Sequence, residues 1–175
     1  MTDKQLDYVK TLNFSAQHLL SLVSDILDFS KIESGKLHLE KTSFNLEKVC
    51  SHVFDLYKSK AEEKGISYTF KPAPVDTFSL YGDPTRLSQI LSNLLSNAIK
   101  FTDKGSVNFS YVVKEKSNAS VELSYSLRED NNHKVVIAFT IKDSGIGIPE
   151  ESQHKIFDSF SQADKSTTRE YGGSG

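Results

Sequence analysis

A change in hydrophobic spacing near Gly105 is the sequence feature that most limits the folds open to this chain. Before it, Asp83-Pro84 predicts the start of a helix with Asp83 as its N-cap, and apolar residues then follow at helical spacings of three and four. They are Leu87, Ile90, Leu91, Leu94, Leu95, Ala98 and Ile99. After it, segments 106–113, 121–127 and 134–142 each alternate apolar and other residues, as half-buried strands do. We therefore predict an α+β fold, a two-layer sandwich of helices on a mixed, mostly antiparallel sheet.

Two further helices are predicted before this region. Residues 4 to about 34 carry a heptad-like apolar seam, and Gly35 is placed to end that helix. The seam comprises Val9, Leu12, Ala16, Leu19, Val23 and Ile26. Asn45 is a suitable N-cap for a second helix that runs to Lys64. We expect the long N-terminal helix to pack in a helical bundle, formed either within one chain or between two chains.

Charge and hydropathy exclude several classes of protein. The 175 residues include 21 basic and 23 acidic side chains, which gives a net charge of -2. This balance does not predict the basic surface that binding to nucleic acid requires. No apolar run approaches the ~20 residues that span a bilayer, so we expect no membrane contact by this chain. The lone cysteine, Cys50, is predicted to lie in the core, as befits a reducing, cytoplasmic compartment.

A stripe of amide side chains is predicted on the helix after Pro84. Gln89, Asn93 and Asn97 follow one another at four-residue spacing, with Lys100 three residues further on. Amide oxygens suit Mg²⁺, which also keeps water and substrate phosphates as ligands, and a lysine can neutralise phosphate charge. A solvated polar helix face is the alternative interpretation of the same stripe.

Two glycine-containing segments are further candidates. Asp143 follows an apolar strand and precedes Gly145 and Gly147, so its carboxylate is placed to accept a hydrogen bond from an adenine amine. An ordinary turn would look the same. The C-terminal run Gly172-Gly-Ser-Gly175 has the composition of a phosphate-binding lid, although a flexible tail is the simpler alternative.

Together these motifs resemble the ATP-binding domain of sensor histidine kinases of two-component systems. That domain belongs to a wider group of ATPases that includes the Hsp90 chaperone, type II topoisomerase and MutL. The matching text is Asn93-Leu-Leu-Ser-Asn97-Ala-Ile-Lys100-Phe101-Thr102, Asp143-Ser-Gly-Ile-Gly-Ile-Pro149, Phe157-Asp-Ser-Phe160 and Arg169-Glu-Tyr-Gly-Gly-Ser-Gly175. Residues 19–36 also resemble the second helix of the family's dimerisation and phosphotransfer hairpin. The resemblance implies a partial hairpin at 1–40 and an ATP-binding domain at 41–175.

The resemblance also implies roles for particular residues. Asn97 would hold Mg²⁺ and Asp143 would fix the adenine of ATP. The other implied nucleotide-binding residues are Asn93, Lys100, Phe101, Gly145, Gly147, Phe160, Arg169, Gly173 and Gly175. A homodimer through the N-terminal helix and a response-regulator receiver domain are the implied partners. This chain is expected to lie in the cytoplasm, which is compatible with a parent protein that another segment anchors in a membrane.

Two departures from the family pattern bear on this chain. The family's phosphoacceptor histidine lies in a His-Glu/Asp-Leu-Arg-x-Pro-like motif, which none of the five histidines matches, so we expect no catalytic residue here. They are His18, His38, His52, His133 and His154. The family's last glycine motif continues into Leu-Gly-Leu and a helix, whereas this sequence ends at Gly175. We therefore expect an incomplete ATP-binding domain that does not phosphorylate itself.

Three functions remain open from the sequence. The first is the ATP-binding part of a histidine protein kinase, which passes the γ-phosphoryl group of ATP to a histidine and then to a response-regulator aspartate. The second is a hydrolytic ATPase of the same superfamily, but the resemblance implies a glutamate base at the position of Asn93, and an amide cannot replace it. The third is a dimerising fragment that binds nucleotide weakly or not at all.

Overall fold

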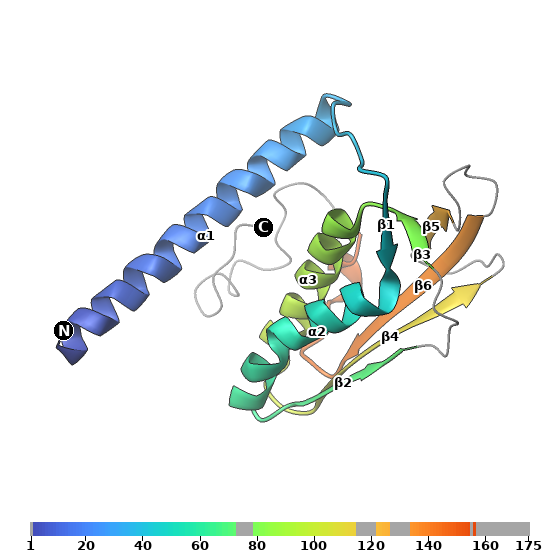
Figure 1. Ribbon diagram of the computed structural model, residues 1–175. Helices are drawn as coiled ribbons and strands as arrows, with labels where there is room; N and C mark the ends of the chain where they lie inside the picture. The colour runs from blue at the N-terminus through green and yellow to red at the C-terminus, as the bar shows by residue number, and fades with distance from the viewer. Residues whose placement is uncertain (1, 73–78, 115–121, 127–133, 155, 157–175) are drawn as a thin grey trace. The chain divides into compact units, whose positions relative to one another are not determined.

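The computed structural model describes residues 2–72, 79–114, 122–126, 134–154 and 156 (Figure 1). The chain forms two compact units, whose described parts are residues 2–38 and the described residues from Leu39 onward. None of the described helices is both long enough and apolar enough to span a membrane.

The first unit is a single helix, α1 (Asp3–Glu33), of 31 residues. Its start is fixed by a reciprocal cap, in which Gln5 N donates to Thr2 Oγ1 and Thr2 N donates to Gln5 Oε1. At its end, Gly35 has a φ of 65° and its N–H donates to Ile32 O, while Lys36 N donates to Lys31 O. These two bonds form a Schellman motif, so Gly35 ends the helix as predicted.

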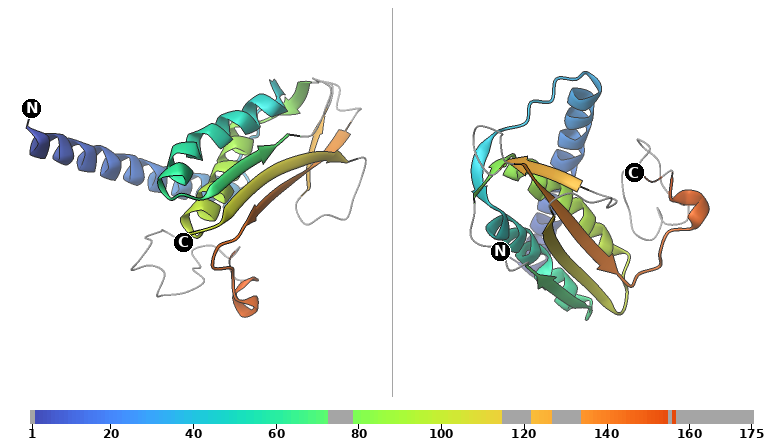
Figure 2. Two further views of the ribbon diagram at one scale, coloured as in Figure 1. Left: turned by 90° about the horizontal axis from the view of Figure 1, so that it is seen from below. Right: turned by 90° about the vertical axis from the view of Figure 1, so that its right-hand side faces the viewer.

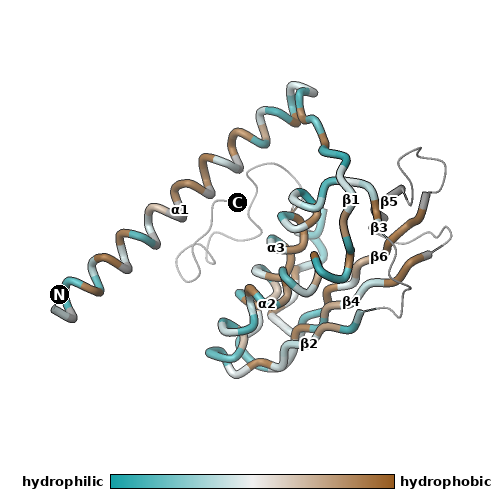
Figure 3. Tube along the Cα trace, in the orientation of Figure 1, coloured by the Kyte–Doolittle hydropathy of each residue, from teal (hydrophilic) through white to brown (hydrophobic). Residues whose placement is uncertain are grey.

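Apolar side chains of α1 lie open to solvent. Leu22 and Phe29 are half-buried and no side chain described in this unit is buried, while ten large apolar side chains are between 40% and 70% exposed. They are Leu6, Tyr8, Val9, Leu12, Leu19, Leu20, Val23, Ile26, Leu27 and Ile32. Figure 3 shows apolar residues recurring along much of the helix. This unit therefore has a large apolar surface and no core of its own.

The second unit contains one six-stranded sheet. Its strands are β1 (Thr42–Asn45), β2 (Ser67–Lys71), β3 (Ser79–Gly82), β4 (Ser106–Lys114), β5 (Glu122–Ser126) and β6 (Lys134–Asp143). They are ordered β1-β3-β5-β6-β4-β2 across the sheet. Only the β2–β4 pair among these is parallel. The prediction of a mixed, mostly antiparallel sheet is confirmed, whereas β1 was not predicted.

Two helices, α2 (Leu46–Glu63) and α3 (Pro84–Lys100), cover one face of this sheet (Figures 1 and 2). Both begin as the sequence predicts: Lys48 N donates to Asn45 Oδ1 at 2.8 Å, and Arg86 N donates to Asp83 Oδ1 at 3.0 Å. A short 3₁₀ helix, η1 (Glu150–Ser152), follows β6. Helices on one face of a sheet form the predicted two-layer sandwich.

The core lies between the two helices and the sheet. It includes most of the predicted apolar face of α3, since Leu87, Leu91, Leu95, Ala98 and Ile99 are buried. Ile90 and Leu94 were also predicted for this face, but they are 42% and 45% exposed because they lie at its edge. Cys50 is fully buried within it, and burial, followed by the charge of Glu47, raises the pKa of its thiol to about 12. Such a thiol stays protonated and unreactive at neutral pH, so Cys50 acts as a core residue, as predicted.

Neighbouring leucines on α3 give a direct test of this packing. Leu95 is fully buried and Leu94 is 45% exposed. We expect Leu95→Ala to lower the free energy of unfolding by about 2–5 kcal/mol, because it removes buried methyl groups and leaves a cavity. Leu94→Ala, the matched control, should cost below about 1 kcal/mol. Chemical denaturation followed by circular dichroism measures both, and equal losses would contradict the orientation of α3 in the structure.

Candidate functional site

The amide stripe predicted on α3 lies on the side of the helix opposite its buried face. Asn93 and Asn97 are exposed one turn apart, while Leu91 and Leu95 point into the core. Gln89 is half-buried, and its Oε1 accepts a hydrogen bond from Arg86 Nη1 at 2.8 Å. One side of α3 thus anchors the helix and the other presents two amide groups to solvent.

The C-terminal end of α3 adds a cation and an aromatic ring. Phe101 N donates to Asn97 O at 3.0 Å, which closes the last turn of the helix. The ammonium of Lys100 lies 5.1 Å from the centroid of the Phe101 ring, a cation–π distance. Both side chains are half-buried. The predicted residues of this segment therefore surround one helix end.

The glycine-containing loop after β6 is bonded to the same helix end. Ile146 N donates to Phe101 O at 3.2 Å, and Gly145 N donates to Asp143 Oδ1 at 2.9 Å. The first bond links two segments that are about 45 positions apart in the sequence, and the second orients the aspartate on its own loop. The structure therefore brings the Asn97–Phe101 segment and the Asp143 loop together.

The backbone of the loop approaches the helix end so closely that only glycine fits at position 145. A Cβ atom built on Gly145 would overlap the carbonyl oxygen of Phe101 and lie 2.9 Å from Asp143 Oδ1. Gly147 meets a different constraint, since its φ is 71° and a Cβ there would meet nothing within 4 Å. The two predicted glycines are thus required for different physical reasons, close approach at 145 and conformation at 147.

Ser144 provides a second link that the sequence did not reveal. Its N–H donates to Ser106 O at 3.1 Å, and its Oγ accepts from Ser106 N at 2.9 Å. Gly105 in the adjoining turn has a φ of 113°, and a Cβ there would overlap Ser144 Oγ. The available signal was a small hydroxyl residue at the end of a strand, but its partner, 38 positions away, depends on strand pairing.

Several predicted residues lie outside the described part of the chain. They are Phe160, Arg169, Gly173 and Gly175, the predicted residues of the lid and the phosphate-binding glycine run. Within the described residues, no three His, Cys, Asp or Glu side chains form a group that could hold a metal ion. A cation beside Asn97 would therefore need ligands other than such a cluster, such as the Asn97 amide oxygen, water and a bound anion.

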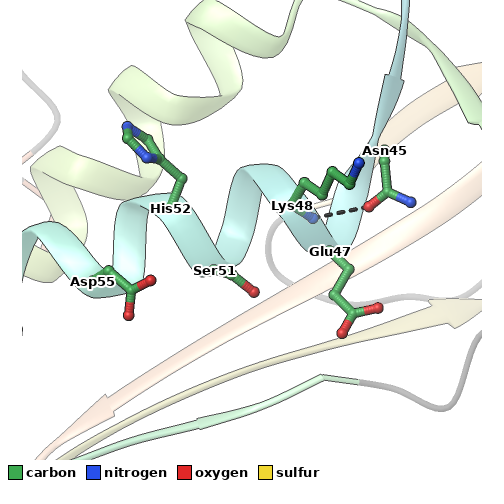
Figure 4. Close-up of a pocket in the computed structure, with 6 residues that line it drawn as sticks. All are labelled: Asn45, Glu47, Lys48, Ser51, His52 and Asp55. Atoms are coloured by element: carbon green, nitrogen blue, oxygen red, sulfur yellow. Dashed lines mark hydrogen bonds between the residues drawn. The ribbon is translucent and has the colours of Figure 1, made fainter.

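A shallow hollow on α2 contains none of the predicted site residues (Figure 4). It is lined by Asn45, Glu47, Lys48, Ser51, His52 and Asp55. The side-chain oxygen Oδ1 of Asn45, in this hollow, already caps α2 by accepting a hydrogen bond from Lys48 N. His52 and Asp55 are exposed on the helix surface, so the hollow has the features of an ordinary solvated helix face.

Comparison with known proteins identifies the family. A family model described as histidine kinase-, DNA gyrase B-, and HSP90-like ATPase matches residues 82–175, more than half of the chain. The chain belongs to this family. The match begins at Gly82, directly before α3, and it includes the amide stripe and the Asp143 loop.

Individual relatives extend the likeness to the whole chain. The chain is 39% identical over all 175 residues to the signal transduction histidine-protein kinase BarA of Escherichia coli, but it spans only 18% of that protein. It is also similar to a crystal structure of full-length ShkA in complex with AMPPNP, at 29% identity and a TM-score of 0.67, covering 96% of this chain and 32% of ShkA. A complex of the histidine kinase ThkA with the response regulator TrrA matches at 25% identity and a TM-score of 0.55, covering 93% and 42% of the two chains.

The contrast between the two loop glycines leads to a prediction. Gly145→Ala should break the bond from Ile146 N to Phe101 O, because the new methyl group would occupy the space of the carbonyl oxygen. We expect a loss of about 1–3 kcal/mol in the free energy of unfolding and faster hydrogen exchange of the Ile146 amide. Chemical denaturation and NMR-detected exchange measure the two effects.

Gly147→Ala is the matched control for this change. It costs about 1–2 kcal/mol through its positive φ alone, and it should leave the Ile146 amide better protected than Gly145→Ala does. An Ile146 amide that exchanges at the wild-type rate in Gly145→Ala would contradict the close approach of loop and helix.

Proposed function

We propose that this chain is the ATP-binding region of a sensor histidine kinase. Residues 41–175 would form the ATP-binding domain, and residues 1–40 would form the second helix of a dimerisation and phosphotransfer hairpin. The domain would bind ATP with Mg²⁺ so that the γ-phosphoryl group passes to a histidine and then to a response-regulator aspartate. The likeness to the BarA kinase over the whole chain and to the AMPPNP complex of ShkA supports this proposal.

The observation that carries the proposal is the bond between Ile146 N and Phe101 O. Through it, the loop with Asp143 lies against the helix end with Asn97 and Lys100. We therefore propose one site made of three groups. The Asp143 carboxylate can accept a hydrogen bond from an amine, and the Asn97 amide and the Lys100 ammonium suit a metal–phosphate group. ATP has an amine on its adenine at one end and phosphates that bind Mg²⁺ at the other.

The exposed side chains fit separate parts of Mg²⁺–ATP. The Asp143 carboxylate would accept a hydrogen bond from the adenine amine, with Gly145 and Gly147 forming the loop around it. The Asn97 amide oxygen would be a ligand of Mg²⁺, with Asn93 beside it, and Lys100 and Phe101 would lie near the nucleotide. The ion, when bound, would neutralise phosphate charge during transfer. Phe160, Arg169, Gly173 and Gly175 are proposed to approach the nucleotide from the C-terminal segment.

The chemistry at Asn93 favours phosphoryl transfer over hydrolysis. A hydrolytic ATPase needs a general base to take a proton from the attacking water. Asn93 is exposed on α3 one turn before Asn97, but its amide cannot accept that proton as a carboxylate would. A kinase needs no such base for water, because its nucleophile is a side chain of the acceptor domain.

Nucleotide titration tests this function. We expect the wild-type chain to bind Mg²⁺–AMPPNP in calorimetry, and Asn97→Ala to weaken binding about tenfold, or about 1.4 kcal/mol, through loss of a metal ligand. Asn108→Ala is the matched control, because Asn108 is exposed on β4, away from α3. It should bind as the wild type does.

GTP, which carries guanine in place of adenine, is a control ligand for the same site. The guanine of GTP has a carbonyl group where adenine has its amine, so the Asp143 carboxylate should disfavour it. ATP should therefore bind more tightly than GTP. A folded wild-type chain that binds neither nucleotide would overturn the proposal and favour the alternative of a dimerising fragment without nucleotide binding.

A homodimer and a response-regulator receiver domain are the proposed partners. The exposed apolar surface of α1 supports self-association, because such a surface gains stability when a second helix covers it. The likeness to the ThkA–TrrA complex supports a receiver domain as the second partner. We place this function in the cytoplasm, where ATP is available.

Charged substitutions in the α1 seam test the dimer. Leu19→Glu combined with Val23→Glu should convert a dimer into a monomer in sedimentation equilibrium, since burying two carboxylates in an apolar interface is costly. Ser24→Glu is the control, because Ser24 is exposed but lies outside the seam. A wild-type chain that stays monomeric at all concentrations, or a double variant that still dimerises, would contradict this role of α1.

A further inference from the structure

We infer that Lys64, at the C-cap of α2, is a positioning residue for the nucleotide site. This inference rests on the proposed function and adds a residue that lies on neither predicted binding segment. Lys64 Nζ donates to the backbone carbonyl oxygens of Ile99 at 2.9 Å, Lys100 at 2.9 Å and Thr102 at 3.0 Å. It also lies 3.5 Å from Asp103 Oδ1.

These bonds use the full donor capacity of the ammonium group. A lysine has three N–H donors, and here each can be matched to one carbonyl oxygen. The last carbonyls of a helix have no partner within the helix, and they form the negative end of its dipole. With only 30% of its side chain exposed, Lys64 is therefore a cation that caps the end of another helix, α3.

Lys64 is itself held in place by the backbone around it. Gly65 N donates to Glu62 O and Ile66 N donates to Ala61 O, which ends α2 in a Schellman motif. The next residue, Ser67, donates its N–H to Gly105 O at 2.9 Å as β2 begins. The lysine thus extends from a fixed point, so its bonds can determine where the end of α3 lies.

A short series of contacts joins Lys64 to the predicted ligand groups. Lys64 binds the backbone carbonyl of Lys100, and the side-chain ammonium of Lys100 is one of the predicted nucleotide-binding groups. The carbonyl of the next residue, Phe101, accepts a hydrogen bond from Ile146 N. That bond fixes the loop of Asp143. If the Lys64 ammonium is removed, the last turn of α3 loses its capping donor. The positions of the Lys100 side chain and of the Asp143 loop are then less restrained.

A positioning role and a purely stabilising role predict different results. A stabilising residue would change nucleotide affinity only through the fraction of folded protein. A positioning residue changes affinity while the protein stays folded, and it loosens the helix end and loop more than the sheet. The experiment therefore needs folded variants and a local measurement.

The test compares Lys64→Met with Lys64→Arg in the full 175-residue chain, well below the unfolding temperature. Lys64→Met keeps the length of the side chain but removes the charge and the donors. We expect its affinity for Mg²⁺–AMPPNP in calorimetry to fall about tenfold, and the Ile146 amide to exchange faster while amides of the β4–β6 pair do not. Lys64→Arg should recover part of the affinity, because a guanidinium can donate to some of the same carbonyls.

Two control variants define the result. Lys60→Met removes an exposed lysine one turn earlier on α2 and should bind nucleotide as the wild type does. Ile137→Val destabilises the buried core at β6 and leaves Lys64 and the carbonyl groups that it binds unchanged, so it shows how much affinity is lost through stability alone. Wild-type affinity in Lys64→Met, or a loss no larger than that of Ile137→Val, would overturn the positioning role. Failure of the wild-type chain to bind is a separate result, and it would overturn the proposed function on which this inference rests.

Discussion

The C-terminal end of α3 is the point on which the candidate site depends. Carbonyl groups at a helix end lack partners within the helix, and those that are buried need donors from elsewhere. This chain supplies them from two distant segments: the Lys64 ammonium binds the carbonyls of Ile99 and Lys100, together with that of Thr102 just beyond the helix, and the Ile146 amide binds that of Phe101. The need to satisfy one helix end thus brings α2, α3 and the loop after β6 together.

α3 serves stability and the candidate site with opposite sides of one helix. Its buried residues contribute to the core, and its exposed amides face away from that core. Because helical residues have a fixed angular spacing, packing of Leu91 and Leu95 also sets the direction of Asn93 and Asn97. The core therefore orients the amides through the geometry of the helix.

The sequence predicted those parts of the structure that depend on neighbouring residues. Asn45 and Asp83 cap their helices through bonds to amides three positions away, and Gly35 ends α1 within its own turn. The alternating spacing of the three later segments was enough to predict β4, β5 and β6. The resemblance to a known family suggested the Asp143 loop and the amide stripe as one site, and the bond from Ile146 N to Phe101 O joins that loop to the end of the helix that carries the stripe.

The contacts that sequence reasoning missed join residues far apart in the chain. Lys64 bonds to carbonyls 35 to 38 positions away, and Ser144 bonds to a residue 38 positions away. A backbone carbonyl is present at every residue, so no residue type marks the acceptor. Similarly, β1 has four residues and is recognisable only through its pairing with β3. Such features depend on the assembled sheet, which local patterns do not specify.

The two units of the chain differ in how they can be stable. The second unit buries apolar side chains between helices and sheet, whereas the described part of the first buries none. The bonds that cap α1 at Thr2 and Gly35 act only on its ends, and caps contribute about 1 kcal/mol each. Most helical stability in proteins comes from packing of an apolar face. The exposed apolar face of this 31-residue helix is therefore the feature that supports the proposed self-association through the α1 seam.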